Sequence, residues 1–123
     1  AMTYLHGLTD FDNFTNFNLT HGYQHGNMIL NEFSNLGRHI LTSASSWRQL
    51  GSDEFVFCLS GDLKVNQEKV AELVRTAHQQ LGTSISVGLI EYPSSTLTET
   101  ILSELKAALM ISKESGKNRI CII

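Results

Sequence analysis

The segment 47–59, WRQLGSDEFVFCL, constrains the fold of this chain more than any other. Its second half, Phe55–Leu59, is a continuous apolar run, which is typical of a strand that is covered on both faces. Gly51-Ser52 in front of it is a residue pair found in two-residue hairpin turns, and glycine at the first central position favours a type II′ turn. The sequence therefore predicts an antiparallel hairpin whose second strand lies inside a sheet.

Two adjacent carboxylates, Asp53 and Glu54, follow the predicted turn and stand at the mouth of the hairpin. Acidic residues at the start of such a strand are either solvated edge residues or ligands of a metal ion. This segment alone leaves both interpretations open.

A second acidic cluster follows the first predicted strand. The apolar-leaning segment Tyr4–Leu8 runs directly into Asp10-Phe11-Asp12. A stretch rich in Asn and Thr comes next, with Gly22 and Gly26 as turn signals. From about Asn27, apolar residues recur at three- and four-residue intervals, which predicts an amphipathic helix.

The second half of the chain predicts two more helices and two more strands. An amphipathic helix that covers 70–81 ends at Gly82, and a further helix is capped by Thr98. Alternating residues predict a strand at 84–92, and a last strand is predicted at 119–123.

The predicted order is strand, helix, strand, strand, helix, strand, helix, strand. This order indicates an α+β fold with a ferredoxin-like βαββαβ core, a palm-type antiparallel sheet with helices largely on one face, and an additional helix and strand. In such a sheet the first strand and the hairpin are commonly neighbours, so we expect Asp10 and Asp53 to approach each other at one edge. Two carboxylates from separate strands suit Mg²⁺ and phosphoryl chemistry, with water and substrate phosphates as the remaining ligands.

Composition indicates one domain and argues against nucleic acid and direct membrane insertion. We interpret residues 1–3 as a short leader and residues 4–123 as a single domain cut from a longer protein. The formal net charge of -3 gives no basic footprint for nucleic acid, and no apolar run is long enough for direct membrane insertion. Cys58 and Cys121 stand in separate apolar runs, which predicts reduced thiols in a cytoplasmic protein.

His21 and His25 are four residues apart and, together with Asp10 or Asp12, are the candidates for a zinc site. Glycines flank the histidine pair, which disfavours a stable helix there. The sequence therefore argues against zinc.

Three separated motifs resemble the GGDEF domain family. The segment 10–14, followed by Asn18 and Asn27, is similar to the first block of the family, and 51–55, GSDEF, is similar to its signature. The segment 113–119, KESGKNR, is similar to its closing block. Active members of the family are diguanylate cyclases, which condense two GTP molecules into cyclic di-GMP across a homodimer.

The resemblance implies roles for individual residues near a metal ion. Mg²⁺ would be held by the Asp10 carboxylate, the Phe11 carbonyl and the Asp53 carboxylate, with Glu54 beside it. Asp53 and Glu54 would be the catalytic carboxylates.

The resemblance also implies a set of nucleotide-binding residues, of which the first two contact guanine and the last two hold phosphates: Asn18, Asn27, Gly51, Ser52, Lys113 and Lys117. Purely structural interpretations stay open, since Asn18 also suits a turn and Lys113 a solvated helix end.

Some of these positions depart from the family pattern. Ser52 adds a Cβ where the second glycine of the signature passes close to the nucleotide. Asn27 stands where a carboxylate accepts both guanine N–H bonds, and Lys117 replaces an arginine and its bidentate fork. Thr42 and Ser45 occupy the places of an Arg-x-x-Asp product-inhibition site, so we expect that site to be absent.

The sequence therefore predicts intact metal ligands and an altered nucleotide-reading shell. This pattern favours a degenerate, regulatory GGDEF domain that binds GTP or a related nucleotide with Mg²⁺, or that holds a homodimer partner or adjacent signalling domains. A weakly active diguanylate cyclase and an interaction scaffold with an empty site are the alternatives. We expect a cytoplasmic domain, either free or as the cytoplasmic portion of a larger, membrane-anchored protein.

Overall fold

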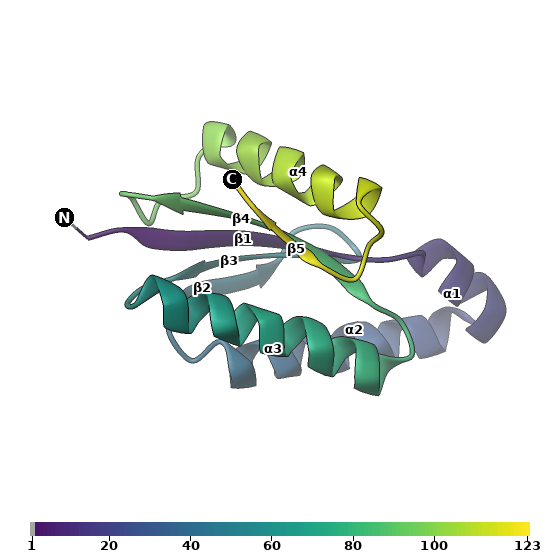
Figure 1. Ribbon diagram of the computed structural model, residues 1–123. Helices are drawn as coiled ribbons and strands as arrows, with labels where there is room; N and C mark the ends of the chain where they lie inside the picture. Colours follow the sequence, from purple (N-terminus) through teal and green to yellow (C-terminus); the bar gives the residue numbers. More distant parts are fainter. Residues whose placement is uncertain (1) are drawn as a thin grey trace.

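The computed structural model describes residues 2–123 and places a five-stranded sheet between helices on its two faces (Figure 1). The predicted leader is described only at Met2 and Thr3, since residue 1 lies outside the described part. In chain order the elements are β1 (Tyr4–Phe11), α1 (Phe14–His21), α2 (Tyr23–Ile40), β2 (Ala44–Gln49), β3 (Glu54–Leu59), α3 (Leu63–Leu81), β4 (Ile85–Tyr92), α4 (Glu99–Glu114) and β5 (Ile120–Ile122).

The sheet has the strand order β2-β3-β1-β4-β5, which confirms the ferredoxin-like core. β1 lies at its centre and pairs antiparallel with β3 and with β4. β5 differs from the expected antiparallel sheet, because it pairs parallel to β4 after the chain has crossed over through α4.

The helices cover both faces of the sheet rather than largely one. α2 and α3 lie on one face and α4 lies on the other (Figure 1). The physical reason is visible in β3 and β4, which are buried at nearly every position and therefore expose apolar side chains on both faces. A second layer is needed to remove those side chains from water.

The prediction for 13–26 was wrong, because this stretch is helical on both sides of one break. α1 covers Phe14–His21 and α2 already begins at Tyr23, with Gly22 at a φ of 91° between them. Asn and Thr have low intrinsic helix propensity. The rings of Phe14 and Phe17 are buried on one side of α1, and this packing stabilises the helix more than the weak propensity disfavours it.

The hairpin is present, but its loop is longer than predicted. Gln49 pairs with Phe55, and the Leu50 N–H donates to the Glu54 carbonyl at 2.8 Å, so the loop is 51–53. Gly51 has no positive φ, which rules out the type II′ turn. The first strand of the hairpin, β2, begins at Ala44, three residues before the segment 47–59 from which the hairpin was predicted.

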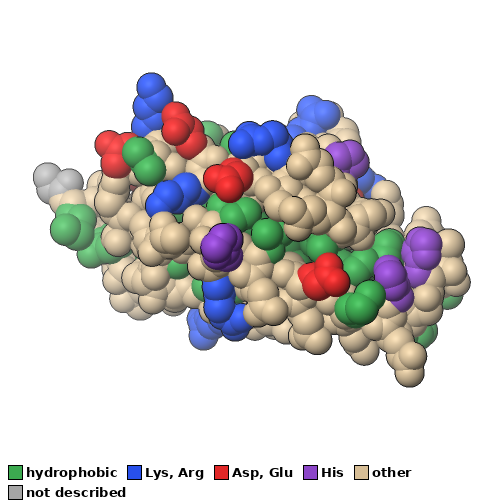
Figure 2. Space-filling model, turned by 90° about the horizontal axis from the view of Figure 1, so that it is seen from below, with side chains coloured by type: hydrophobic (Ala, Val, Ile, Leu, Met, Phe, Trp, Pro, Cys, Tyr) green, Lys and Arg blue, Asp and Glu red, His purple; other side chains and the backbone are tan. Residues whose placement is uncertain are grey.

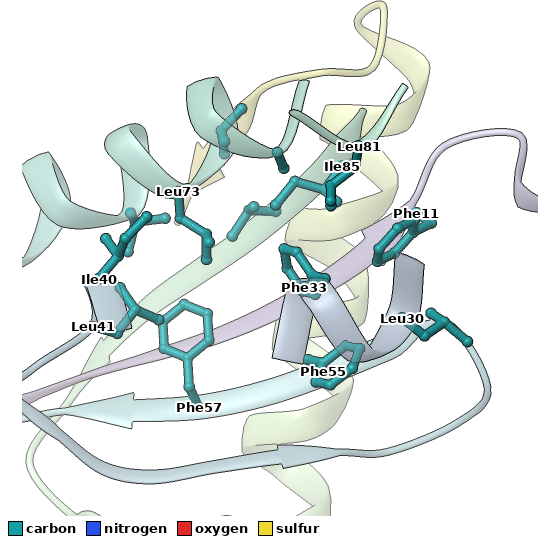
Figure 3. Packing of buried hydrophobic residues seen from close by; sticks show 14 of the residues in the cluster. Phe11, Leu30, Phe33, Ile40, Leu41, Phe55, Phe57, Leu73, Leu81 and Ile85 are labelled. Carbon is teal, nitrogen blue, oxygen red and sulfur yellow. The ribbon is translucent and has the colours of Figure 1, made fainter. Parts of the chain in front are cut away.

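Aromatic rings form the centre of the core between the sheet and α1 to α3 (Figure 3). The ring centroid of Phe33 lies 5.0 Å from that of Phe11 and 5.1 Å from that of Phe55, both in edge-to-face geometry. Trp47 stacks on Phe55 at 5.2 Å. This packing joins α2 to the ends of β1 and β3, where the acidic residues lie.

A second, smaller core lies between the sheet and α4. Ile101, Leu105 and Leu109 of α4 pack on Leu8 and Val56 of the sheet. The close approach depends on a strand residue without a side chain, because a Cβ on Gly88 would lie 2.5 Å from the Leu109 nitrogen and 2.6 Å from the Leu105 carbonyl oxygen.

Surface features of residues 2–123 are unremarkable for a globular domain. None of the helices there is long and apolar enough to span a bilayer. Side chains of both charges are interspersed over the face that Figure 2 shows. Both cysteines are free, and Cys58 is buried.

We predict that Gly88→Ala lowers the free energy of unfolding by about 1–3 kcal/mol, since the added methyl group meets the backbone of α4 rather than a flexible side chain. Urea unfolding measures this as a lower midpoint at constant slope. Ser103→Ala, on the exposed side of α4, is the control. A midpoint unchanged by Gly88→Ala would contradict the tight packing described above.

Candidate functional site

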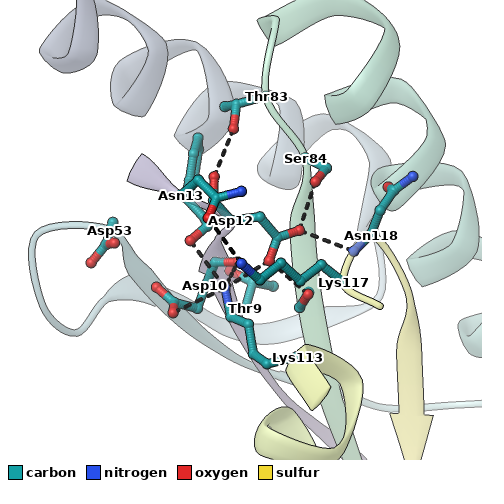
Figure 4. A network of polar contacts seen from close by, with 12 residues as sticks. Thr9, Asp10, Asp12, Asn13, Asp53, Thr83, Ser84, Lys113, Lys117 and Asn118 are labelled. Atoms are coloured by element: carbon teal, nitrogen blue, oxygen red, sulfur yellow. Dashed lines mark hydrogen bonds and ion pairs between the residues drawn. The ribbon is translucent and has the colours of Figure 1, made fainter. Parts of the chain in front are cut away.

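The acidic residues predicted from separate motifs meet at one end of the sheet. Asp10 in β1 lies opposite Glu54 in β3, and the Phe11 N–H donates to the Asp53 carbonyl at 3.3 Å. The hairpin therefore brings Asp53 beside the end of β1, as the sequence predicted (Figure 4). The arrangement arises from the antiparallel pairing of a strand that ends in acid with a strand that starts in acid.

Lys113, near the C-terminal end of α4, extends its ammonium group into this acidic end of the sheet. Its Nζ lies 3.3 Å from Asp10 Oδ2 and 2.7 Å from Asp12 Oδ1. It also donates to the Phe11 carbonyl at 3.0 Å and to the Asp10 carbonyl at 3.4 Å. One cation thus contacts two of the three groups expected to hold a metal ion.

Asp12, which the sequence analysis named only as a candidate zinc ligand, has a different part in this site. Its carboxylate is 3% exposed and accepts hydrogen bonds from the Ser84 and Ser86 hydroxyls at 2.6 and 2.7 Å and from the Asn118 N–H at 3.0 Å. Burial acts to raise its pKa, but these donors and Lys113 outweigh it, so the pKa of Asp12 is lowered. Asp12 is therefore a structural anion that ties Lys113 to the sheet.

The pKa of Asp10 shifts in the opposite direction to that of Asp12. Burial, opposed by Lys113 and assisted by the negative charges of Asp53 and Glu54, raises the pKa of Asp10 to about 6. A carboxylate in that position gains most from an additional positive charge. The geometry thus leaves Asp10 partly uncompensated even with Lys113 in contact.

The donor set at this end of the sheet fits Mg²⁺. Two carboxylates and the Phe11 carbonyl are hard oxygen donors, and Mg²⁺ commonly takes one or two carboxylates and fills its remaining positions with water and phosphate. The ammonium of Lys113 already occupies a cation position against Asp10 and Phe11. Across residues 2–123, no cluster of three or more metal-ligating side chains occurs, so a metal here would depend on the carbonyl and on non-protein ligands.

A groove of about 310 Å³ adjoins Asp10 on the side of α4. Lys106, Leu109 and Met110 line it together with Lys113. The groove therefore combines an apolar floor with two lysines and the Asp10 carboxylate at its border.

Asn18 and Asn27 come from the two helices that meet at Gly22. Asn18 packs against Gly26 of α2, where a Cβ would lie 1.9 Å from its Oδ1. This Oδ1 is buried and has no hydrogen-bond partner. Gly26 is therefore not a turn signal but the residue that lets α1 and α2 approach, and the exposed Asn27 follows it directly.

The serine of the signature is accommodated in the exposed hairpin loop. The Gln49 side chain donates to the Ser52 carbonyl at 2.6 Å, and the Ser52 hydroxyl donates to Asp53 Oδ1 at 3.4 Å. Gly51 precedes it, and a Cβ there would lie 3.2 Å from Glu54 Oε1. The loop therefore forms with serine in place, and the added hydroxyl lies next to a predicted metal ligand.

Lys117 makes a contact that the sequence did not predict. It adopts a φ of 65° and its Nζ donates to Asn13 Oδ1 at 2.8 Å. Its ammonium thus joins the loop after α4 to the loop after β1.

The two histidines lie on different helices, which corrects the expectation that no stable helix forms around them. His21 ends α1 and His25 lies in α2. Their ring centroids are 5.5 Å apart, and both rings pack against Phe17. This aromatic contact accounts for their spacing.

Comparisons with known proteins agree with this geometry. The family model described as "Diguanylate cyclase, GGDEF domain" matches residues 7–119. The chain is 29% identical over 114 residues to diguanylate cyclase DgcS of Shewanella oneidensis, covering 89% of this chain and 38% of that protein. It is 25% identical to diguanylate cyclase A of Treponema denticola, covering 94% of this chain and 34% of that protein. The chain thus spans little more than a third of the length of these curated relatives.

Solved structures share the fold. The GGDEF domain of DgcB from Caulobacter crescentus, in complex with c-di-GMP, aligns with a TM-score of 0.86 at 21% identity and covers 98% of this chain and 78% of that one. Diguanylate cyclase SiaD from Pseudomonas aeruginosa, in complex with its activator SiaC, aligns with a TM-score of 0.86 at 23% identity, over 98% and 50% of the two chains. Because the family model matches nearly the whole length of this chain, the chain belongs to the GGDEF domain family.

Proposed function

We propose that this domain binds a magnesium–GTP complex and acts as a regulatory module of cyclic di-GMP signalling. One observation carries the proposal: a cation, the Lys113 ammonium, already lies against the Phe11 carbonyl and the Asp10 carboxylate. A cation position next to a carboxylate whose pKa is raised to about 6 favours a divalent ion.

In this proposal different residues bind the metal, the phosphates and the base. Asp10, Asp53 and the Phe11 carbonyl would hold Mg²⁺, which neutralises the triphosphate and bridges it to the protein. Lys113 would exchange part of its contact with Asp10 for the phosphates, while Asp12 keeps its ammonium near the metal. Asn18 Oδ1, which is buried against Gly26 without a partner, would accept a hydrogen bond from the base after rotation of its amide.

The regulatory role is favoured over efficient catalysis by the altered contacts. Ser52 places a hydroxyl beside Asp53, and Lys117 is engaged with Asn13. A single ammonium also lacks the bidentate fork with which arginine holds a phosphate. These changes leave the metal ligands and weaken the groups that would align a nucleotide for reaction.

A weakly active diguanylate cyclase is the second candidate. It is supported by the retention of both Asp53 and Glu54 at the hairpin and by a loop that forms with Ser52 in place. Asp53 and Glu54 would then be catalytic, and the reaction would need a second copy of the domain, since it joins two GTP molecules. An interaction scaffold with an empty site is the remaining alternative, with a homodimer partner or a neighbouring signalling domain as its ligand.

We predict that excess Mg²⁺–GTP raises the thermal midpoint of the domain, since a ligand that binds only the folded state stabilises it by about 2.7 kcal/mol at 100 times its Kd. Asp53→Ala should abolish the rise. Glu72→Ala, which removes an exposed carboxylate of α3, should leave it intact. No rise in the unaltered domain would leave the scaffold as the function that remains.

Binding should weaken in acid. The pKa of Asp10 is raised to about 6, so below that pH its carboxylate carries a proton that competes with Mg²⁺. The affinity for Mg²⁺–GTP should then fall by up to about tenfold per pH unit. The Mg²⁺–GTP stabilisation at pH 5 and pH 7.5 measures the effect. Carbon NMR of the metal-free carboxylates separates it from protonation of GTP itself, and an Asp10 midpoint near 4 would refute the explanation.

The cyclase candidate has its own test. The domain, at high concentration to favour dimers, is incubated with Mg²⁺ and GTP, and the nucleotides are identified by mass. Cyclic di-GMP that disappears with Asp53→Ala would establish catalysis, and Ser52→Gly should then increase its yield severalfold. Unchanged GTP in both the unaltered domain and Ser52→Gly would argue against catalysis by this domain.

A further inference from the structure

The face of the sheet that carries α4 is only partly covered by that helix. α4 packs on β1, β4 and β5, and the side chain of Val56 in β3 shares this face with Leu8 in β1. Cys58, two residues along β3, points to the same side. On the edge strand β2, Ser46 and Arg48 pair with Cys58 and Val56, so their side chains lie on this face as well. The strands β3 and β2 thus extend the face beyond the helix.

A cleft of about 240 Å³ opens over this extended part of the sheet. It is lined by residues of β1, β2, β3 and the loop before α4, among them His6, Ser46, Arg48, Cys58, Ser95 and Leu97. The cleft lies toward the start of β1, whereas Asp10 lies near the end of that strand. Neither Thr42 nor Ser45 lines it, so it is also distinct from the place of the product-inhibition site.

A buried histidine fixes the wall that the loop before α4 contributes. His6 is 1% exposed, and its Nε2 lies 2.7 Å from the Ser94 carbonyl oxygen. A carbonyl oxygen only accepts, so Nε2 carries a proton and donates it. This bond ties the loop that contains Ser95 and Leu97 to β1, and the cleft is therefore formed in the absence of a ligand.

The floor of the cleft is uncharged, and its border carries one cation. Val56 and Cys58 are buried in the floor, and burial raises the pKa of the Cys58 thiol, which keeps it neutral. None of the described residues that line the cleft is acidic. The ion pairs within residues 2–123 both belong to Lys113, so Arg48 has no carboxylate partner in that part of the chain. The cleft thus combines apolar contact area with an unpaired guanidinium.

We propose that this cleft binds a small carboxylic acid with an apolar body, whose carboxylate pairs with Arg48. A guanidinium matches a carboxylate with two parallel N–H···O bonds, and the Ser46 and Ser95 hydroxyls are further donors at the cleft. A cavity of about 150 Å³ holds a benzene ring. The larger cleft of about 240 Å³ therefore has room for a ring or a branched chain together with its carboxylate. This site does not depend on the proposed binding of magnesium and nucleotide.

Three probes separate the two parts of this recognition. Benzoate has both the ring and the charge, benzamide has the ring alone, and acetate has the charge alone. Each is titrated into the nucleotide-free domain at constant ionic strength, and binding is followed by amide NMR shifts. Benzoate should bind about tenfold or more tightly than either of the other two, because only benzoate adds a charge-assisted bond to apolar burial. The shifts should centre on Ser46, Cys58 and Ser95.

Other results would overturn the proposal in different ways. Equal binding of acetate would reduce the site to a general anion contact, and equal binding of benzamide would show that Arg48 does not pair with the ligand. Shifts centred on Lys106 and Lys113 would place benzoate in the groove beside Asp10 instead. Absence of saturable benzoate binding would contradict the ligand class itself.

A matched pair of variants assigns the charge recognition to one residue. Arg48→Met removes the guanidinium from an exposed position and should weaken benzoate by about tenfold or more, with benzamide unchanged. Arg75→Met makes the same change at an exposed position of α3, on the opposite face of the sheet, and should leave both probes unchanged. Equal weakening in the two variants would reduce the effect to net charge and would contradict the role given to Arg48.

A further variant tests the cleft by filling it. Ser46→Phe introduces a ring from an exposed position of the edge strand and should abolish benzoate binding. Urea unfolding of the same variant, with an unchanged midpoint, separates a filled cleft from a lost fold. Benzoate that binds this folded variant as tightly as the unaltered domain would show that the cleft is not its site.

Discussion

The contact between Lys113 and Asp12 holds the functional end of this molecule together. Asp12 directly follows β1, and its carboxylate also accepts from Ser84 and Ser86, on either side of the first residue of β4, and from the Asn118 N–H ahead of β5. Lys113 brings in the end of α4 at 2.7 Å. A buried carboxylate is tolerated only when it is paired and hydrogen-bonded, so the folding of these segments around Asp12 is a condition of its burial.

The same contact fixes the position of Lys113 at the acidic end of the sheet. Because Asp12 holds the ammonium of Lys113, that group also reaches the Phe11 carbonyl and the Asp10 carboxylate. The pKa of Asp12 is lowered, so its contribution to stability is present above the ordinary aspartate pKa and is lost as the pH falls through the lowered value. Asp10 loses its charge near pH 6 instead. Two aspartates two residues apart therefore differ: the partners of Asp12 stabilise its charge, and the charge of Asp10 is only partly compensated.

Local sequence signals predicted the order of the strands along the chain and the meeting of Asp10 with Asp53, because alternation, apolar runs and capping residues are properties of short segments. They did not predict the parallel pairing of β5. They failed for the helical start of α1, where buried phenylalanines override weak propensity, and for the hairpin loop. The structural role of Asp12 was missed for a different reason. Its partners lie 72 to 106 residues further along the chain, and no local pattern encodes a contact that only the closed sheet creates.

In the proposed function, the charges at this end of the sheet would couple the binding of the metal to the binding of the nucleotide. Asp10 and Asp12 contact one cation, Lys113. Burial and the negative charges of Asp53 and Glu54 raise the pKa of Asp10 to about 6 in spite of that contact. A free triphosphate would add further negative charge to this end of the sheet and would be repelled. A Mg²⁺ ion between them would attract both the carboxylates and the triphosphate, and so would replace this repulsion by attraction. In the proposed function the metal and the nucleotide would therefore bind together, and loss of a carboxylate that holds Mg²⁺ would weaken the binding of both.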